Sequence, residues 1–141
     1  MPLLPIEHHD LARLIAIYIY GLGAGAAWIA AIAAPNTSYD KLDAARADSH
    51  IRALLRTASA HIAFALLVAC LLAALSGLHL SALFGLIAAA GFIANRLILS
   101  RRSTAGRVRE RRQARRVIAV GLTLVFMLVI LLAMIFAVMR L

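Results

Sequence analysis

The amino-acid sequence predicts an all-α polytopic membrane protein, a four-transmembrane-helix bundle with the N-terminus and the C-terminus both outside the cytosol. Three observations predict it: an apolar composition, four long uncharged segments, and a one-sided distribution of basic residues. Hydrophobic residues make up 64% of the chain and charged residues 15%, against about 45 to 50% apolar residues in ordinary soluble domains. A globule of 141 residues could not hide so much apolar surface from water.

Each uncharged segment is long enough to cross a bilayer. The first has 21 residues, which at about 1.5 Å per residue span roughly 30 Å, the thickness of the hydrocarbon layer. We expect Pro35 to end this span. Residues 57–95 hold two spans, with a reversal at Ser76 and Gly77. The predicted spans are residues 14–34, 57–75, 80–99 and 117–139.

The whole chain, 1–141, is predicted to form a single integral membrane domain. The first span is preceded by Glu7, His8, His9 and Asp10 rather than by basic residues, so it is not expected to be a cleaved signal peptide. The segment 36–56 mixes apolar and charged residues, which predicts a surface helix that continues into the second span.

The basic residues give the orientation, because short cytosolic connections are enriched in Lys and Arg. Arg13 and Arg140 are the two basic residues left for the extracytoplasmic side, and Arg96 is expected to snorkel toward the cytosol from the third span. The predicted location is therefore a bacterial-type inner membrane. The cytosolic side would carry Lys41, Arg46, Arg52 and Arg56, together with the basic loop 100–116 that contains Arg101, Arg102, Arg107, Arg109, Arg111, Arg112, Arg115 and Arg116.

The eight arginines of this loop predict contact with anionic lipid headgroups. Each basic residue close to the surface contributes about 1 kcal/mol to such contact. Nucleic acid is not an expected partner, because no aromatic residues are interleaved with the arginines for base stacking.

Small residues recur at a spacing of four, which allows close approach of helix backbones in lipid. The predicted packing positions are Gly21, Gly25, Ala27 and Gly85. Ala27 belongs to a row of small residues with Gly23 and Ala31. They would serve packing within the chain, a homo-oligomer, or contact with other membrane subunits. Tyr18, Tyr20 and Trp28 are expected at the membrane interfaces.

His61 is the first candidate for chemistry, as a proton-carrying group or a haem or metal ligand. Its helical row continues through Ala65, Ala69 and Ala73, which predicts a closely packed face. The alternative is a neutral imidazole bonded to a nearby backbone group. No other span supplies a second histidine for a bis-histidine haem.

A weaker candidate is an extracytoplasmic copper or zinc site made from His8, His9 and His79, whose alternative is a set of solvated polar flanks. The sequence does not specify which metal such a site would take. Most consistent with the composition is a protein without a cofactor.

No catalytic motif or phosphate loop is found, and all six acidic residues fall outside the spans. The favoured function is a non-enzymatic subunit or an assembly and interaction factor of a larger membrane complex. The alternative is a small-solute or metal transporter, or a haem- or metal-binding membrane protein that works through His61. The four-span layout, with Trp28 and an Ala34–Pro35 exit before a basic loop helix, resembles small bacterial membrane families of the copper-resistance D type. No residue role is carried over from this likeness.

Overall fold

The computed structural model describes residues 8–100 and 108–141, and for residues 108–116 it describes the backbone alone. Within these residues every element is helical, and four helices are long and apolar enough to cross a membrane. The predicted all-α bundle of four bilayer-length helices is confirmed at this level. In chain order the elements are α1 (His8–Trp28), η1 (Ile29–Ala33), α2 (Ala34–Lys41), α3 (Ala44–Leu75), α4 (His79–Ser100) and α5 (Val108–Val138).

Pro35 does not end the first helical stretch, contrary to the prediction, and the chain continues as helix through α2. Proline lacks an N–H group, so a carbonyl in the preceding turn loses its backbone donor. The π-helical turn η1 precedes the proline, and the N–H of Ala34 donates to the carbonyl of Ile29. The hydroxyls of Thr37 and Ser38 then donate to the carbonyl of Ala34 at 3.0 and 2.7 Å. The wider turn thus carries the helix up to the proline, and the two hydroxyls add hydrogen bonds within the first turn of α2.

The predicted surface segment 36–56 is two helices joined by a sharp bend. Leu42 is extended, with φ −127° and ψ 150°, and α3 begins two residues later and runs unbroken into its membrane-length part. The hydroxyl of Tyr39 donates to the carboxylate of Asp48 and joins α2 to the start of α3. The continuation into the second span is confirmed, and the single surface helix is corrected to a helical hairpin.

The reversal between α3 and α4 lies at Ser76 and Gly77, as predicted. Gly77 has φ 77°, a left-handed conformation that glycine adopts without cost. Its N–H donates to the carbonyl of Ala74 at 3.0 Å, and the N–H of Leu78 donates to that of Ala73 at 2.9 Å. This is the Schellman motif, and the burial of Leu78 completes it.

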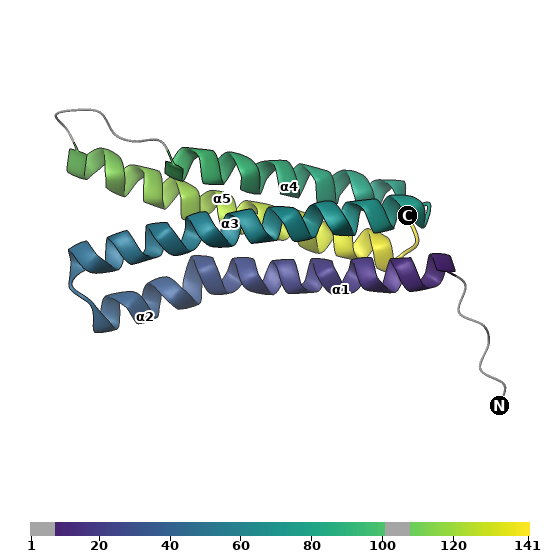
Figure 1. The fold of residues 1–141 in the computed structure, drawn as a ribbon, viewed down its shortest axis with the longest axis horizontal. Helices are drawn as coiled ribbons and strands as arrows, with labels where there is room; N and C mark the ends of the chain where they lie inside the picture. Colours follow the sequence, from purple (N-terminus) through teal and green to yellow (C-terminus); the bar gives the residue numbers. More distant parts are fainter. Residues whose placement is uncertain (1–7, 101–107) are drawn as a thin grey trace.

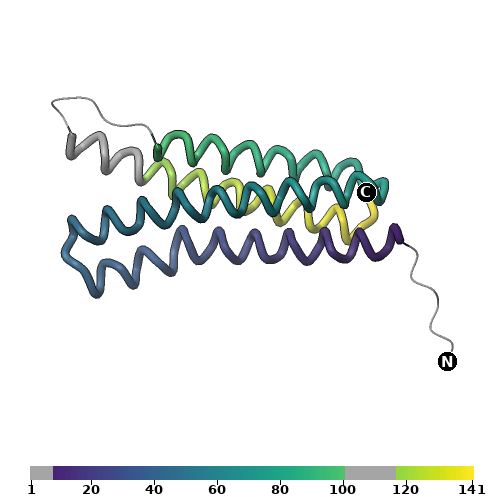
Figure 2. Tube along the Cα trace, viewed as in Figure 1, coloured from purple at the N-terminus to yellow at the C-terminus, as the bar shows by residue number. Residues whose placement is uncertain are grey.

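The four long helices form an antiparallel bundle in which α1 and α4 occupy opposite corners (Figure 1). Each of these two helices packs against both α3 and α5. The start of α1, the α3–α4 turn and the C-terminus lie together at one end (Figure 2). Because α3 has 32 residues and α4 has 22, the hairpin of α2 and the start of α3 extends about 15 Å past the end of α4.

The bundle interior is built mainly from alanine, with a few large side chains between the alanine layers. Small side chains let helix backbones approach closely, which is the chief source of packing energy between helices in lipid. Phe92 packs against Phe126 with ring centroids 6.2 Å apart. Fully buried members of the core include Ala16, Tyr20, Ala27, Leu66, Ala69, Ala73, Ala88, Ala89, Phe92, Ile130, Ala133 and Ala137.

Candidate functional site

His61 lies on the outer surface of the bundle, not on the closely packed face that was predicted for it. A row of residues spaced by four rotates about 40° around the helix at each step, because a turn has 3.6 residues. Over twelve residues the row has therefore turned by about 120°, so that Ala69 and Ala73 are buried and His61 is exposed. Nδ1 of His61 lies 2.9 Å from the carbonyl oxygen of Thr57.

The structure does not assemble the predicted three-histidine metal site. His8, His9 and His79 are all exposed near the same end of the bundle. Among the side chains that the structure describes, those of residues 8–100 and 117–141, no three His, Cys, Asp or Glu form a group that could hold a metal ion. His9 has a structural partner instead, since its Nδ1 lies 3.1 Å from the carbonyl oxygen of Leu75 at the end of α3.

Arg13 joins the start of α1 to the end of α5. Its Nε donates to the carbonyl of Ala137 at 2.9 Å, and its Nη2 donates to the carbonyl of Val138 at 3.0 Å. The last carbonyls of a helix have no partner in their own helix, and a cation there also opposes the negative end of the helix dipole. Oδ1 of Asp10 lies 3.8 Å from Nη1 of Arg13 and 3.2 Å from Nη2 of Arg140. These residues close one end of the bundle, and they form a polar pocket of about 250 Å³ with His9 and Ser76.

The predicted packing positions divide between the inside and the outside of the bundle. Ala27 and Gly85 are buried. Gly21 and Gly25 are exposed. For a Cβ added at Gly21 the nearest described atom would be Met134 Sδ at 3.9 Å, and a Cβ added at Gly25 would meet no described atom within 4 Å. The neighbouring row that contains Gly23 faces inward, so Gly21 and Gly25 are free to contact something outside the chain.

Tyr20 is fully buried at the centre of the bundle, although an interfacial position was predicted for it. Its hydroxyl crosses from α1 to α4, where it donates to the carbonyl of Ser81 at 3.2 Å. The ring lies over Gly85, at which a Cβ would be only 2.9 Å from Tyr20 Cε1 and 2.7 Å from Cys70 Sγ. Ser81 in turn donates through Oγ to the carbonyl of Ala133 at 2.9 Å.

A second buried polar contact joins α4 to α5, and it was not predicted from the sequence. Nδ2 of Asn95 donates to Thr123 Oγ1 at 2.9 Å and to the carbonyl of Ala119 at 3.2 Å. Thr123 donates to the same carbonyl at 2.8 Å. Oδ1 of Asn95 is buried and has no hydrogen-bond partner in the described chain. The signal in the sequence is an amide, Asn95, and a hydroxyl, Thr123, inside spans of mainly apolar residues, where uncompensated polar groups are costly.

The basic segment is only partly described. Arg101, Arg102 and Arg107 lie outside the described residues, and Arg109, Arg111, Arg112, Arg115 and Arg116 lie in α5 without described side chains. Because α5 begins at Val108, the second half of the predicted loop 100–116 is helix that continues into the last span, as expected for a helix that runs through the basic segment. Contact of these arginines with lipid remains a prediction.

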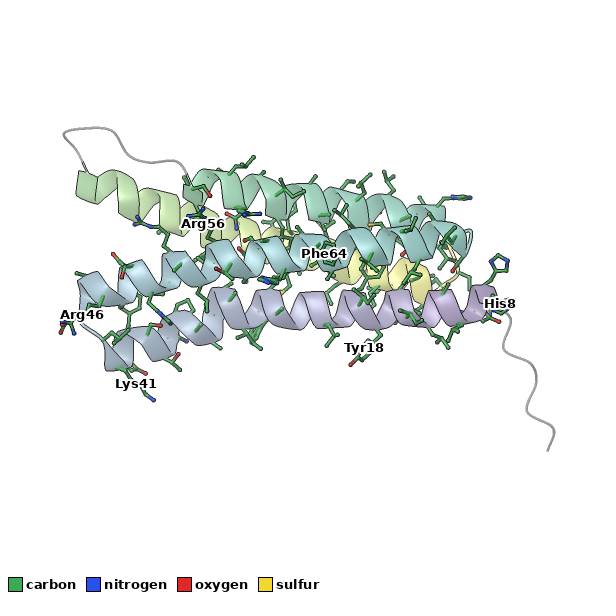
Figure 3. All side chains as sticks on the ribbon, in the orientation of Figure 1. His8, Tyr18, Lys41, Arg46, Arg56 and Phe64 are labelled. Carbon is green, nitrogen blue, oxygen red and sulfur yellow. The ribbon has the colours of Figure 1, made fainter. Side chains whose placement is uncertain are left out.

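A groove of about 250 Å³ opens between α3 and α4 on the outside of the bundle. It is apolar along its length and has Arg96 at one end. Figure 3 shows Phe64, one of its walls, midway along α3, with Arg56 nearer the end at which α4 finishes. The lining residues are Ala60, Ala63, Phe64, Leu67, Ile93, Arg96 and Leu97.

The comparisons with known proteins add no family to these observations. No family model, no curated protein and no solved structure matches the chain.

Proposed function

We propose that this protein is a non-enzymatic subunit, or an assembly and interaction factor, of a larger membrane complex. It would be held to a partner membrane helix along the outer face of α1. The observation that carries this proposal is the outward position of Gly21 and Gly25.

The face around Gly25 has the shape that a second helix needs. Tyr18, Leu22 and Ile29 are 67%, 55% and 59% exposed and surround the glycine on the same side of the helix. Figure 3 shows Tyr18 pointing away from the other helices. A shallow, glycine-lined depression between large apolar side chains lets a second backbone approach closely, and such packing drives helix association in lipid. The fold itself does not require glycine at position 25, since a Cβ there would be unopposed by any described atom.

The charges favour a defined orientation for this subunit in a bacterial-type inner membrane. Lys41, Arg46 and Arg56 lie toward the end that carries the α2–α3 hairpin (Figure 3). Arg13 lies at the opposite end, where its guanidinium is bonded to the end of α5. By the excess of basic residues in cytosolic connections, the hairpin and the segment 100–116 would lie in the cytosol and both termini outside it. The eight arginines of that segment would rest on anionic headgroups.

The alternative, a transporter or cofactor-binding protein that works through His61, gains no support from the geometry. His61 faces outward and bonds to its own helix. The bundle interior is filled by alanine and a few aromatic side chains, and such packing suits a rigid structural subunit.

Copurification with a glycine variant tests the proposal. The protein is extracted from its native membranes in mild detergent and the masses of its complexes are determined. We expect Gly25→Leu to reduce recovery of the partner at least tenfold while thermal stability stays unchanged. Gly121→Leu is the matched control, because Gly121 is also exposed, with no described atom within 4 Å of a Cβ. Equal recovery in the two variants would contradict the proposal.

A further inference from the structure

We propose that the groove between α3 and α4 binds one anionic phospholipid, with an acyl chain along the groove and the phosphate at Arg96 and Arg56. This inference goes beyond the subunit role, because it concerns a different edge of the bundle and needs no protein partner.

The groove lies at the depth of one bilayer leaflet. Counted along α3 from its end at Leu75, Leu67 lies about 12 Å and Arg56 about 28 Å away. Counted along α4 from His79, Arg96 lies about 26 Å away. The hydrocarbon layer is about 30 Å thick, so the apolar part of the groove occupies one leaflet and both guanidinium groups reach its headgroup boundary.

The residues of the groove match the two parts of a phospholipid. Its walls are aliphatic or aromatic side chains, with Phe64 71% and Leu97 60% exposed on either side. Ala60 and Ala63 form the floor from α3, where small side chains leave room for a chain of methylene groups. The described residues thus offer an acyl chain a shallow apolar channel that ends at a cation.

Arg56 adds a second positive charge at that end. It precedes Ala60 by one turn on the same face of α3 and is exposed, as is Arg96. Neither arginine forms an ion pair within the part of the chain that the structure describes. An arginine beside hydrocarbon needs an anion or water for its guanidinium, and basic pockets between helices at a membrane surface are known binding places for acidic headgroups. The two charges therefore favour a phosphate without a compensating amine.

A tryptophan reporter inside the groove tests this site directly. Trp28 is the only tryptophan of the chain, so the Trp28→Phe, Phe64→Trp protein reports on the groove alone. It is reconstituted in phosphatidylcholine bilayers that contain a minor fraction of phosphatidylglycerol. Fluorescence quenching is compared between bilayers in which the acyl chains of one lipid or the other are brominated. We expect brominated phosphatidylglycerol to quench more than its mole fraction explains. Each of the two arginines should raise the affinity of the groove for phosphatidylglycerol, relative to phosphatidylcholine, by about fivefold.

Charge-matched variants separate the groove from the general basicity of the chain. Arg56→Gln with Arg96→Gln should remove the preference, and Ala60→Leu should weaken it by filling the groove. The controls are Lys41→Gln with Arg46→Gln at the hairpin tip, and Arg111→Gln with Arg112→Gln in the basic segment, each of which also removes two charges. The preference should survive in both controls. The proposal is overturned if the reporter shows no preference, if the groove pair retains it, or if either control loses it to the same extent.

Discussion

The ring of Tyr20 on α1 lies across the bundle axis against Gly85 on α4, so the two helices at opposite corners touch through one aromatic ring and one missing side chain. The Tyr20 hydroxyl continues to the carbonyl of Ser81 at 3.2 Å. The contact links helices that share no long interface of their own. It sets how closely the four helices can approach at this depth.

Gly85→Ala is expected to destabilise the bundle. The added methyl group would lie 2.7 Å from Cys70 Sγ and against the Tyr20 ring, and overpacking of a closely packed interior costs about 1 to 3 kcal/mol. Thermal unfolding in detergent, followed by circular dichroism, measures the loss. Gly121→Ala serves as control, because its methyl group would meet no described atom within 4 Å. An unchanged midpoint in Gly85→Ala would show that the interior can relax around this contact.

Arg13→Gln is expected to loosen the end of α5. The substitution removes the charged donor to the carbonyls of Ala137 and Val138, and hydrogen bonds to charged groups contribute about 1.5 to 3 kcal/mol. Hydrogen exchange of the last turns of α5 should become faster. Arg140→Gln should change exchange much less, since its ion pair with Asp10 is exposed and such pairs contribute about 0 to 1 kcal/mol. Similar exchange in both variants would argue against the Arg13 contact.

The Asn95 and Thr123 pair should show measurable coupling. Interhelical hydrogen bonds in membrane proteins average about 0.6 kcal/mol, with a maximum near 1.7. We expect the upper part of that range, because the Nδ2 to Oγ1 contact of 2.9 Å is fully buried. A double-mutant cycle with Asn95→Ala and Thr123→Ala, read by reversible unfolding in detergent micelles, gives the value. Strict additivity of the two substitutions would rule the contact out.

Single-cysteine labelling tests the orientation. In a Cys70→Ala background, Leu141→Cys should react with a membrane-impermeant maleimide in intact cells. Asp40→Cys, in the exposed helix α2, should react only after the membrane is opened. This follows from the excess of basic residues at the hairpin end. The reverse order of labelling would invert the proposed topology.

The helices could be predicted from the sequence because length and uncharged composition determine which segments suit a bilayer. The end of the first helical stretch could not, since the chain passes Pro35 by widening the turn before it, in which the N–H of Ala34 donates to the carbonyl of Ile29. The residues of this turn, 29–33, are alanine and isoleucine like much of the span, so they carry no signal for a wider turn.

The faces of the helices were harder to predict than their lengths. In alanine-rich spans several rows of small residues compete, and composition does not tell which row turns inward. Gly25 and Gly23 are two residues apart, yet the first is exposed and the second is buried. The burial of Tyr20 depends on the space that Gly85 leaves on a distant helix. Such pairings are properties of the assembled bundle, so they lie beyond what one sequence reveals.

The most direct test of the central claim is cross-linking at Gly25 in native membranes. A Cys70→Ala, Gly25→Cys protein is labelled with a thiol-reactive benzophenone, which on irradiation inserts into the C–H bonds of whatever packs against it in the membrane. It is compared with a Cys70→Ala, Gly121→Cys protein labelled in the same way. The account predicts one discrete adduct of higher mass at position 25, either with a distinct subunit or with a second copy, and monomer at position 121. Monomer at both positions, or the same adducts at both, would contradict the claim that the outer face of α1 binds a partner helix.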